Sequence, residues 1–146
     1  MARRSTRKIV LDSSVIVKWF TKEEGSSSAL KLLDSFTEAG SLEITISELA
    51  FYEVANALRY KPGFSSEDVE RCISNLLELE LDVKKLDGPL LLESAEAAFV
   101  GKVTFYDAVP AAIAKLEGIQ CITADVKSQF LPLSLRRYPV RLLEAQ

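Results

Sequence analysis

Short apolar runs that alternate with amphipathic segments limit most strongly how this chain can fold. The run from Ile9 to Leu11 is fully apolar and β-branched, which is typical of a strand buried on both faces of a parallel sheet. Further short runs predict strands at residues 42–46, 81–84, 120–123 and 140–142. Because helix-like sequence separates most of these runs, we expect an α/β fold whose parallel sheet is covered on both faces.

The intervening segments carry the signals of helices. Apolar residues recur three and four positions apart, and Ser, Thr or Asp residues stand where helices would begin. The predicted helices cover residues 13–20, 29–36, 47–60, 65–79, 89–99 and 104–117. Pro110 would remove a backbone hydrogen bond from the last of these, so we expect its regular part to begin near Asp107 or to kink just after it.

Length and composition indicate one domain. The chain has 146 residues, 48% of them hydrophobic, with no internal repeat or linker. No apolar run approaches the roughly 20 residues that cross a bilayer, and no signal-peptide core follows the basic N-terminus. We therefore expect a cytoplasmic protein without a membrane partner. Cys72 and Cys121 lie far apart in apolar surroundings, which indicates buried free thiols.

The chain contains no histidine. This absence excludes Ser-His-Asp and Cys-His nucleophiles, imidazole bases and every metal site with a histidine ligand. Any catalysis must then use carboxylates, hydroxyls, lysines or a metal held by oxygen.

The net charge of −3 conceals an uneven distribution. Four of the 18 basic residues fall within the first eight positions, so the rest of the chain is more acidic than the total suggests. An acidic balance counts mildly against a nucleic-acid binder. An acidic cluster that binds a cation would lower the net charge in the same way.

Two acidic residues follow predicted strands closely. Asp12 comes directly after the first strand, and Asp125 comes just after the strand that ends at Thr123. Ligands of open α/β sheets bind beyond the carboxyl ends of the strands, which gives both acids a possible functional role. Each is equally well placed to cap a helix.

Two further acids lie on predicted helices. Glu53 falls on an apolar stripe, with no lysine or arginine three or four positions away to pair with it. Alternatively, Glu53 lies at the edge of this stripe and its carboxylate reaches solvent. Asp107 follows Thr104 by three positions, a capping-box spacing at a helix start. The apolar stripe comprises Leu49, Ala50, Ala57 and Tyr60.

Together these acids predict a metal site. Carboxylates that converge without histidine bind hard cations such as Mg²⁺ or Mn²⁺ through oxygen. Such ions activate water and neutralise charge during phosphoryl displacement, so phosphodiester hydrolysis is the chemistry that we expect. A phosphoacceptor receiver domain or a haloacid-dehalogenase-like phosphatase would need a second acid near Asp12, where Ser13 and Ser14 stand instead.

Four segments that contain these acids resemble the PIN-domain family, and in particular its VapC-like toxin branch. The segments span residues 9–15, 53–58, 106–108 and 123–125, in the family's order. The resemblance implies a three-layer α/β/α fold with a central parallel sheet. We expect a single PIN-like domain over residues 1–146, in which residues 1–8 form a basic N-terminal arm.

The resemblance also implies an activity. Many family members are ribonucleases that depend on Mg²⁺ or Mn²⁺. By analogy, Asp12, Glu53, Asp107 and Asp125 would be both the catalytic and the metal-binding residues. The hydroxyls of Ser14 and Thr123 would line the same site. The alternative is a PIN fold that serves as a binding or assembly module with weak or lost catalysis.

The resemblance extends to partners. It implies an RNA substrate, a cognate antitoxin protein and a homodimer, as in the toxins of type II toxin–antitoxin pairs. We expect the apolar helices at residues 29–36 and 69–79 to supply the dimer surface, because they carry more hydrophobic side chains than one small sheet needs. Basic residues would bind RNA at the rim of the site: the arm from Arg3 to Lys8, Arg59, Lys61, Lys102 and Lys127.

Overall fold

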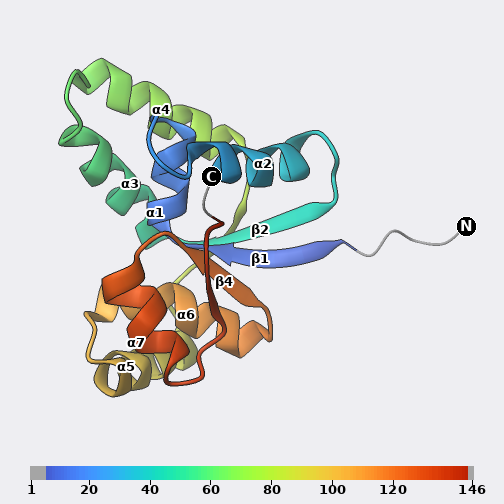
Figure 1. Cartoon of the computed structure of the whole chain (residues 1–146), viewed down its shortest axis with the longest axis vertical. Coiled ribbons are helices and arrows are strands. Elements are labelled where there is room, and N and C mark those ends of the chain that lie inside the picture. Colours follow the sequence, from blue (N-terminus) through green and yellow to red (C-terminus); the bar gives the residue numbers. More distant parts are fainter. Residues whose placement is uncertain (1–5, 145–146) are drawn as a thin grey trace, which may run out of the picture.

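Five parallel strands form the centre of the molecule (Figure 1). The structure, a computed structural model, describes residues 6–144. Its strands lie in the order β3-β2-β1-β4-β5, and each neighbouring pair is parallel. They are β1 (Arg7–Leu11), β2 (Leu42–Ser47), β3 (Asp82–Lys84), β4 (Gln120–Thr123) and β5 (Val140–Leu142). The predicted parallel sheet is confirmed.

Helices cover both faces of this sheet, which gives the expected three-layer α/β/α architecture (Figure 1). One face carries α1 (Ser13–Ile16), the 3₁₀ helix η1 (Val17–Trp19), α2 (Ser26–Thr37), α3 (Leu49–Arg59) and α4 (Ser66–Glu78). The other face carries α5 (Gly88–Gly101), α6 (Phe105–Glu117) and α7 (Leu131–Ser134). A π-helical turn, η2 (Val126–Phe130), leads from β4 into α7.

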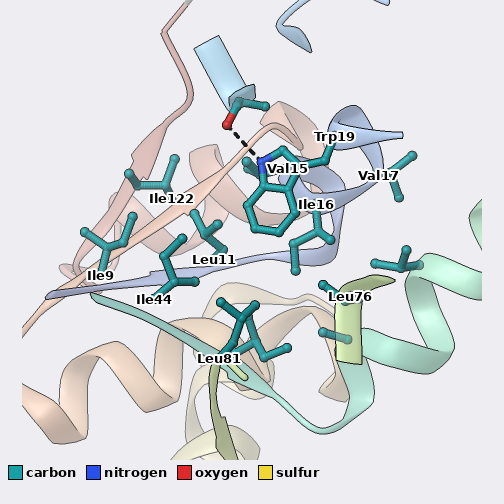
Figure 2. Close-up of a cluster of buried hydrophobic side chains, with 14 of the residues drawn as sticks. Ile9, Leu11, Val15, Ile16, Val17, Trp19, Ile44, Leu76, Leu81 and Ile122 are labelled. Carbon is teal, nitrogen blue, oxygen red and sulfur yellow. Dashed lines mark hydrogen bonds between the residues drawn. The ribbon is translucent and has the colours of Figure 1, made fainter. Parts of the chain in front are cut away.

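The alternating side chains of β1 divide the core into two clusters. Ile9 and Leu11 belong to the cluster beneath α1 to α4, whereas Val10 belongs to the cluster on the opposite face. In Figure 2 the indole N–H of Trp19 donates to the carbonyl of Ala29, over 2.8 Å, at the edge of the first cluster. Because both faces of β1 are buried, the strand is apolar throughout its second half.

Helix α6 differs from its predicted form. Thr104 caps the helix, which begins at Phe105 and continues through Pro110 to Glu117. This confirms the helix predicted over residues 104–117, whereas the expectation that its regular part begins near Asp107 is wrong by two residues. The carbonyl deprived of its donor by Pro110 belongs to Tyr106, in the first turn, so the loss is confined to the beginning of the helix.

The N-terminal segment also differs from its prediction. Residues 1–5, with Arg3 and Arg4, lie outside the described residues. Arg7 and Lys8 belong to β1 rather than to an arm, because β1 pairs with β2 from Arg7 onward. The Lys8 ammonium lies 3.5 Å from Asp82 Oδ2 and 3.7 Å from Glu117 Oε2, so it joins the strand to two other elements.

Two smaller expectations need correction. Cys72 and Cys121 are both free thiols, but only Cys121 is buried, whereas Cys72 is half-buried. Most apolar side chains of α2 and α4 pack against the core rather than forming a free surface. The apolar side chains of α5 are exposed to a greater extent, because Leu92 is 75% and Phe99 85% exposed.

In the part of the chain that the structure describes, no single helix is long and apolar enough to cross a membrane. Helices α5 and α6 meet the length and composition criteria only as a pair, and they are bent by 117° relative to one another.

Candidate functional site

The sheet order brings the ends of β1 and β4 together. These strands are neighbours, and Leu11 pairs with Ile122. Asp12 therefore lies beside the end of β4, where its backbone N–H donates to the Ile122 carbonyl over 3.1 Å. The Thr123 hydroxyl donates to Asp12 Oδ2 over 3.3 Å. Ser14 Oγ lies 3.3 Å from Thr123 Oγ1, so the structure groups Asp12 with both predicted hydroxyls.

Asp12 combines two possible roles that the sequence left open. It caps α1, because its Oδ2 accepts the Ser14 backbone N–H over 3.0 Å. The residue is nevertheless only 2% exposed, which is rare for a charged side chain. Ser14 in turn accepts the Ala124 backbone N–H over 2.9 Å. The first turn of α1 and the end of β4 are thus locked together around the carboxylate.

Glu53 reaches this group from α3, though not from the face that the sequence indicated. The buried face of α3 consists of Ala50, Val54 and Leu58, while Tyr60 is exposed. Glu53 lies on the flank of that face and is half-buried. Burial raises the pKa of its carboxyl to about 7, and the negative charges of Asp12 and Asp107 contribute to the rise.

Asp107 approaches from α6. It stands in the first turn of the helix, where its backbone N–H donates to Thr104 Oγ1 over 3.1 Å. Burial raises the pKa of its carboxyl, and the charges of Asp12 and Asp125 act in the same direction. Hydrogen bonds from Gln129 and Thr104 oppose the rise without cancelling it. Asp107 is therefore within electrostatic range of all three other acids.

Asp125 has a structural role of its own. It caps η2, because its Oδ1 accepts the Ser128 backbone N–H over 2.9 Å. Its own backbone N–H donates to Thr123 Oγ1 over 3.0 Å. The hydroxyl of Thr123 thus links the backbone of Asp125 to the side chain of Asp12.

One residue of the site was missed by the sequence analysis. Gln129, on η2, is buried and donates from its Nε2 to Asp12 Oδ1 over 2.9 Å. The same nitrogen lies 3.3 Å from Asp107 Oδ1. Nothing in the sequence distinguishes Gln129 from a surface glutamine, because its position depends on the π-helical geometry of η2.

The chemistry of this donor set suits a hard divalent cation. Its four acids supply oxygen ligands only, and within residues 6–144 none of them forms an ion pair with a lysine or arginine. The charges of neighbouring acids instead help to raise the pKa of Glu53 and of Asp107, a repulsion that a cation would relieve. Over the same residues, however, no three Asp, Glu or Cys side chains lie close enough to form a metal-binding group. The acids share an electrostatic environment without forming a closed ligand shell.

Two of the basic residues predicted to bind RNA at the rim of the site already have partners within the chain. Lys61 is paired with Glu23, with its ammonium 2.9 Å from Oε2. The Arg59 guanidinium lies 5.2 Å from the ring centroid of Tyr60. Lys102 and Lys127 are exposed, and neither forms an ion pair in the described part of the chain. They stand close in sequence to Asp107 and Asp125 respectively.

A comparison with known protein families matches most of the chain. The model of the PIN domain matches residues 9–130, a range that contains all four acids and Gln129. The chain belongs to the PIN-domain family. A search of curated protein sequences finds no significant match.

Solved structures of PIN-domain proteins have the same fold. VapC20 from Mycobacterium tuberculosis, described as a toxin that cleaves the sarcin–ricin loop, is 16% identical over 89% of this chain and 95% of that chain, with a TM-score of 0.68. FitAcB from Neisseria gonorrhoeae is 19% identical over 93% and 96%, with a TM-score of 0.66. VapBC2 from Rickettsia felis, bound to a promoter DNA fragment, is 14% identical over 94% and 99%, with a TM-score of 0.66. Because the identities are below 25%, these similarities establish the shared fold alone.

Proposed function

We propose that this PIN-domain protein is an endoribonuclease that depends on Mg²⁺ or Mn²⁺. Its catalytic and metal-binding residues are then Asp12, Glu53, Asp107 and Asp125. The observation that carries the proposal is the hydrogen-bonded group at the ends of β1 and β4, in which Gln129 joins Asp12 to Asp107 and Thr123 joins Asp12 to Asp125. Glu53 lies close enough to this group for the charges of Asp12 and Asp107 to raise its pKa. Burying like charges together costs stability, and functional sites are where such a cost is commonly found.

The chemistry of each group follows from its place. When bound, a divalent cation activates water and neutralises the charge that develops in an in-line phosphoryl displacement. Ser14 and Thr123 hold Asp12 in one orientation through the Ser14 backbone N–H and the Thr123 hydroxyl. With no histidine in the chain, carboxylates are the residues available at this site to hold the ion. The exposed ammonium groups of Lys102 and Lys127 would attract the phosphates of a bound RNA.

The biological setting is proposed from the fold. Its neighbours include a toxin that cleaves the sarcin–ricin loop and several toxin–antitoxin complexes. We infer by analogy that the substrate is RNA, that the chain is the toxin of a type II pair in the cytoplasm, and that a cognate antitoxin protein inhibits it.

Purified protein is expected to cleave single-stranded RNA in the presence of Mg²⁺ or Mn²⁺ and to lose this activity in excess chelator. Re-addition of Mn²⁺ should restore cleavage, because the carboxylates alone cannot neutralise the transition state. A gel assay on a fluorescent RNA measures both steps. Cleavage that persists in chelator would rule out the metal mechanism. A folded protein that cleaves no RNA under any of these conditions would favour the binding or assembly module.

The homodimer is also part of the proposal, with α5 rather than α2 or α4 as its surface. Leu92 and Phe99 are two helical turns apart, so they lie on the same face of α5, and both are largely exposed. Phe99→Glu should convert a dimer into a folded monomer, because it would place a charge in an apolar contact. Light scattering at micromolar concentration measures the change, with Leu77→Glu on α4 as the matched control. A dimer that survives Phe99→Glu but not Leu77→Glu would assign the contact to α4 instead.

A further inference from the structure

The amide of Gln129 lies between two acids of the candidate site. Its Nε2 is 2.9 Å from Asp12 Oδ1 and 3.3 Å from Asp107 Oδ1, and the side chain is only 4% exposed. An ionised carboxylate can only accept hydrogen bonds. The amide therefore presents its two N–H groups to two negative charges, as a partly positive group would.

We propose that Gln129 is an internal substitute for the cation, which satisfies Asp12 and Asp107 in the metal-free protein and must withdraw before a divalent ion binds. This inference rests on the proposed function, since it treats the same two acids as metal ligands. It adds that the chain itself supplies a group, the amide of Gln129, that competes with the ion.

The hydrogen bonds of Asp12 show which of its oxygens is involved. Oδ2 already accepts the backbone N–H of Ser14 and the hydroxyl of Thr123. Oδ1 is the oxygen left for a further partner, and the amide of Gln129 occupies it. The same amide occupies Oδ1 of Asp107. Gln129 thus bonds the two oxygens through which these acids would share an ion.

An ion held between these two carboxylates would take the place of the amide. Oxygens that bind Mg²⁺ lie about 2.1 Å from the ion. An ion midway between the two Oδ1 atoms would therefore lie too close to Nε2, which is 2.9 Å and 3.3 Å from them.

The local structure allows Gln129 to leave without unfolding. The start of η2 is held by Asp125, whose side chain accepts from Ser128 and whose carbonyl accepts the Phe130 backbone N–H over 2.9 Å. The side chain of Gln129 takes no part in this cap. Withdrawal of this side chain therefore breaks no hydrogen bond of the cap.

Gln129→Met tests the proposal, because methionine has a similar length but donates no hydrogen bond. Isothermal titration with Mn²⁺ should show binding about tenfold tighter than in the wild type, the effect of one hydrogen bond to a charged group that no longer has to be broken. Without metal, the variant should melt a few degrees lower than the wild type. Gln120→Met, at an exposed position on β4, is the matched control and should leave Mn²⁺ affinity unchanged.

The outcomes separate this inference from the proposed function. If the wild type binds Mn²⁺ and Gln129→Met binds it equally or more weakly, Gln129 is no competitor and the inference is wrong, while the metal mechanism stands. If neither protein binds Mn²⁺, both proposals fall. Should the methionine variant not fold, Gln129→Asn gives the same test, because its amide is one methylene too short to reach both acids.

Discussion

Asp12→Asn is expected to lower kcat/KM for RNA cleavage by about 100- to 1000-fold, the usual cost of removing one electrostatic group from a preorganised site. The fold should persist, since asparagine also caps helices well and can accept the Ser14 N–H in place of the carboxylate. Thermal stability should change little, because the loss of one repelling charge offsets the loss of the hydrogen bond from Gln129 to Asp12 Oδ1. Single-turnover cleavage of a labelled RNA with Mg²⁺, together with a melting curve, measures both effects.

Asp87→Asn is the matched control. Asp87 also caps a helix, as its Oδ1 accepts the Leu90 backbone N–H over 2.9 Å, but it does so on α5, away from the four acids. The same chemical change there should leave cleavage unaffected. Wild-type turnover by Asp12→Asn in Mg²⁺ would remove Asp12 from the proposed catalytic set.

Glu53→Gln is expected to stabilise the metal-free protein at pH 8 by about 1–2 kcal/mol, less than the full pKa shift implies because Glu53 is partly exposed to solvent, and to abolish cleavage. The pKa of Glu53 is about 7 in the folded chain, against an ordinary value of 4.5. Between these values the folded protein keeps a proton that the unfolded chain releases, so stability falls as the pH rises through this window. The loss of stability caused by ionising Glu53 in the folded protein is complete above pH 7 and absent below pH 4.5. Glutamine stays neutral throughout and avoids it.

Urea denaturation in chelator at pH 5 and at pH 8 tests this expectation. The stabilisation by Glu53→Gln should be small at pH 5 and large at pH 8, whereas Glu43→Gln, at an exposed position on β2, should show no such difference. An equal effect of Glu53→Gln at both pH values would show that the carboxyl of Glu53 ionises normally. Since a proton and a cation compete for the same carboxylate, Mn²⁺ affinity in the wild type should also fall below pH 7.

The fold was predictable because its signals are local. Apolar runs such as Ile9 to Leu11 identify strands buried on both faces, and capping residues such as Ser65 and Thr104 locate the starts of α4 and α6. The positions of Asp12 and Asp125 after neighbouring strands followed from the rule that strand ends meet at one edge of a parallel sheet.

The remaining features depend on tertiary packing. The packing of α3 decides that Val54 faces the core while Glu53 lies on the flank, whereas the sequence pattern placed Glu53 on the apolar stripe itself. Gln129 reaches Asp12 only because η2 forms a π-helical turn after β4, which no local pattern indicates. The ion pairs of Lys8 with Asp82 and Glu117 join residues that are distant in sequence, so no local pattern indicates them.

The central claim is that the four acids hold a divalent ion, and anomalous diffraction from crystals soaked in Mn²⁺ tests it most directly. The account predicts a manganese peak among the carboxylates of Asp12, Glu53, Asp107 and Asp125, with the amide of Gln129 displaced from Asp12. Soaked crystals of Asp12→Asn should show a weaker peak or none. A protein that cleaves RNA with Mn²⁺ in solution, yet shows no manganese among these carboxylates in the crystal, would contradict the claim.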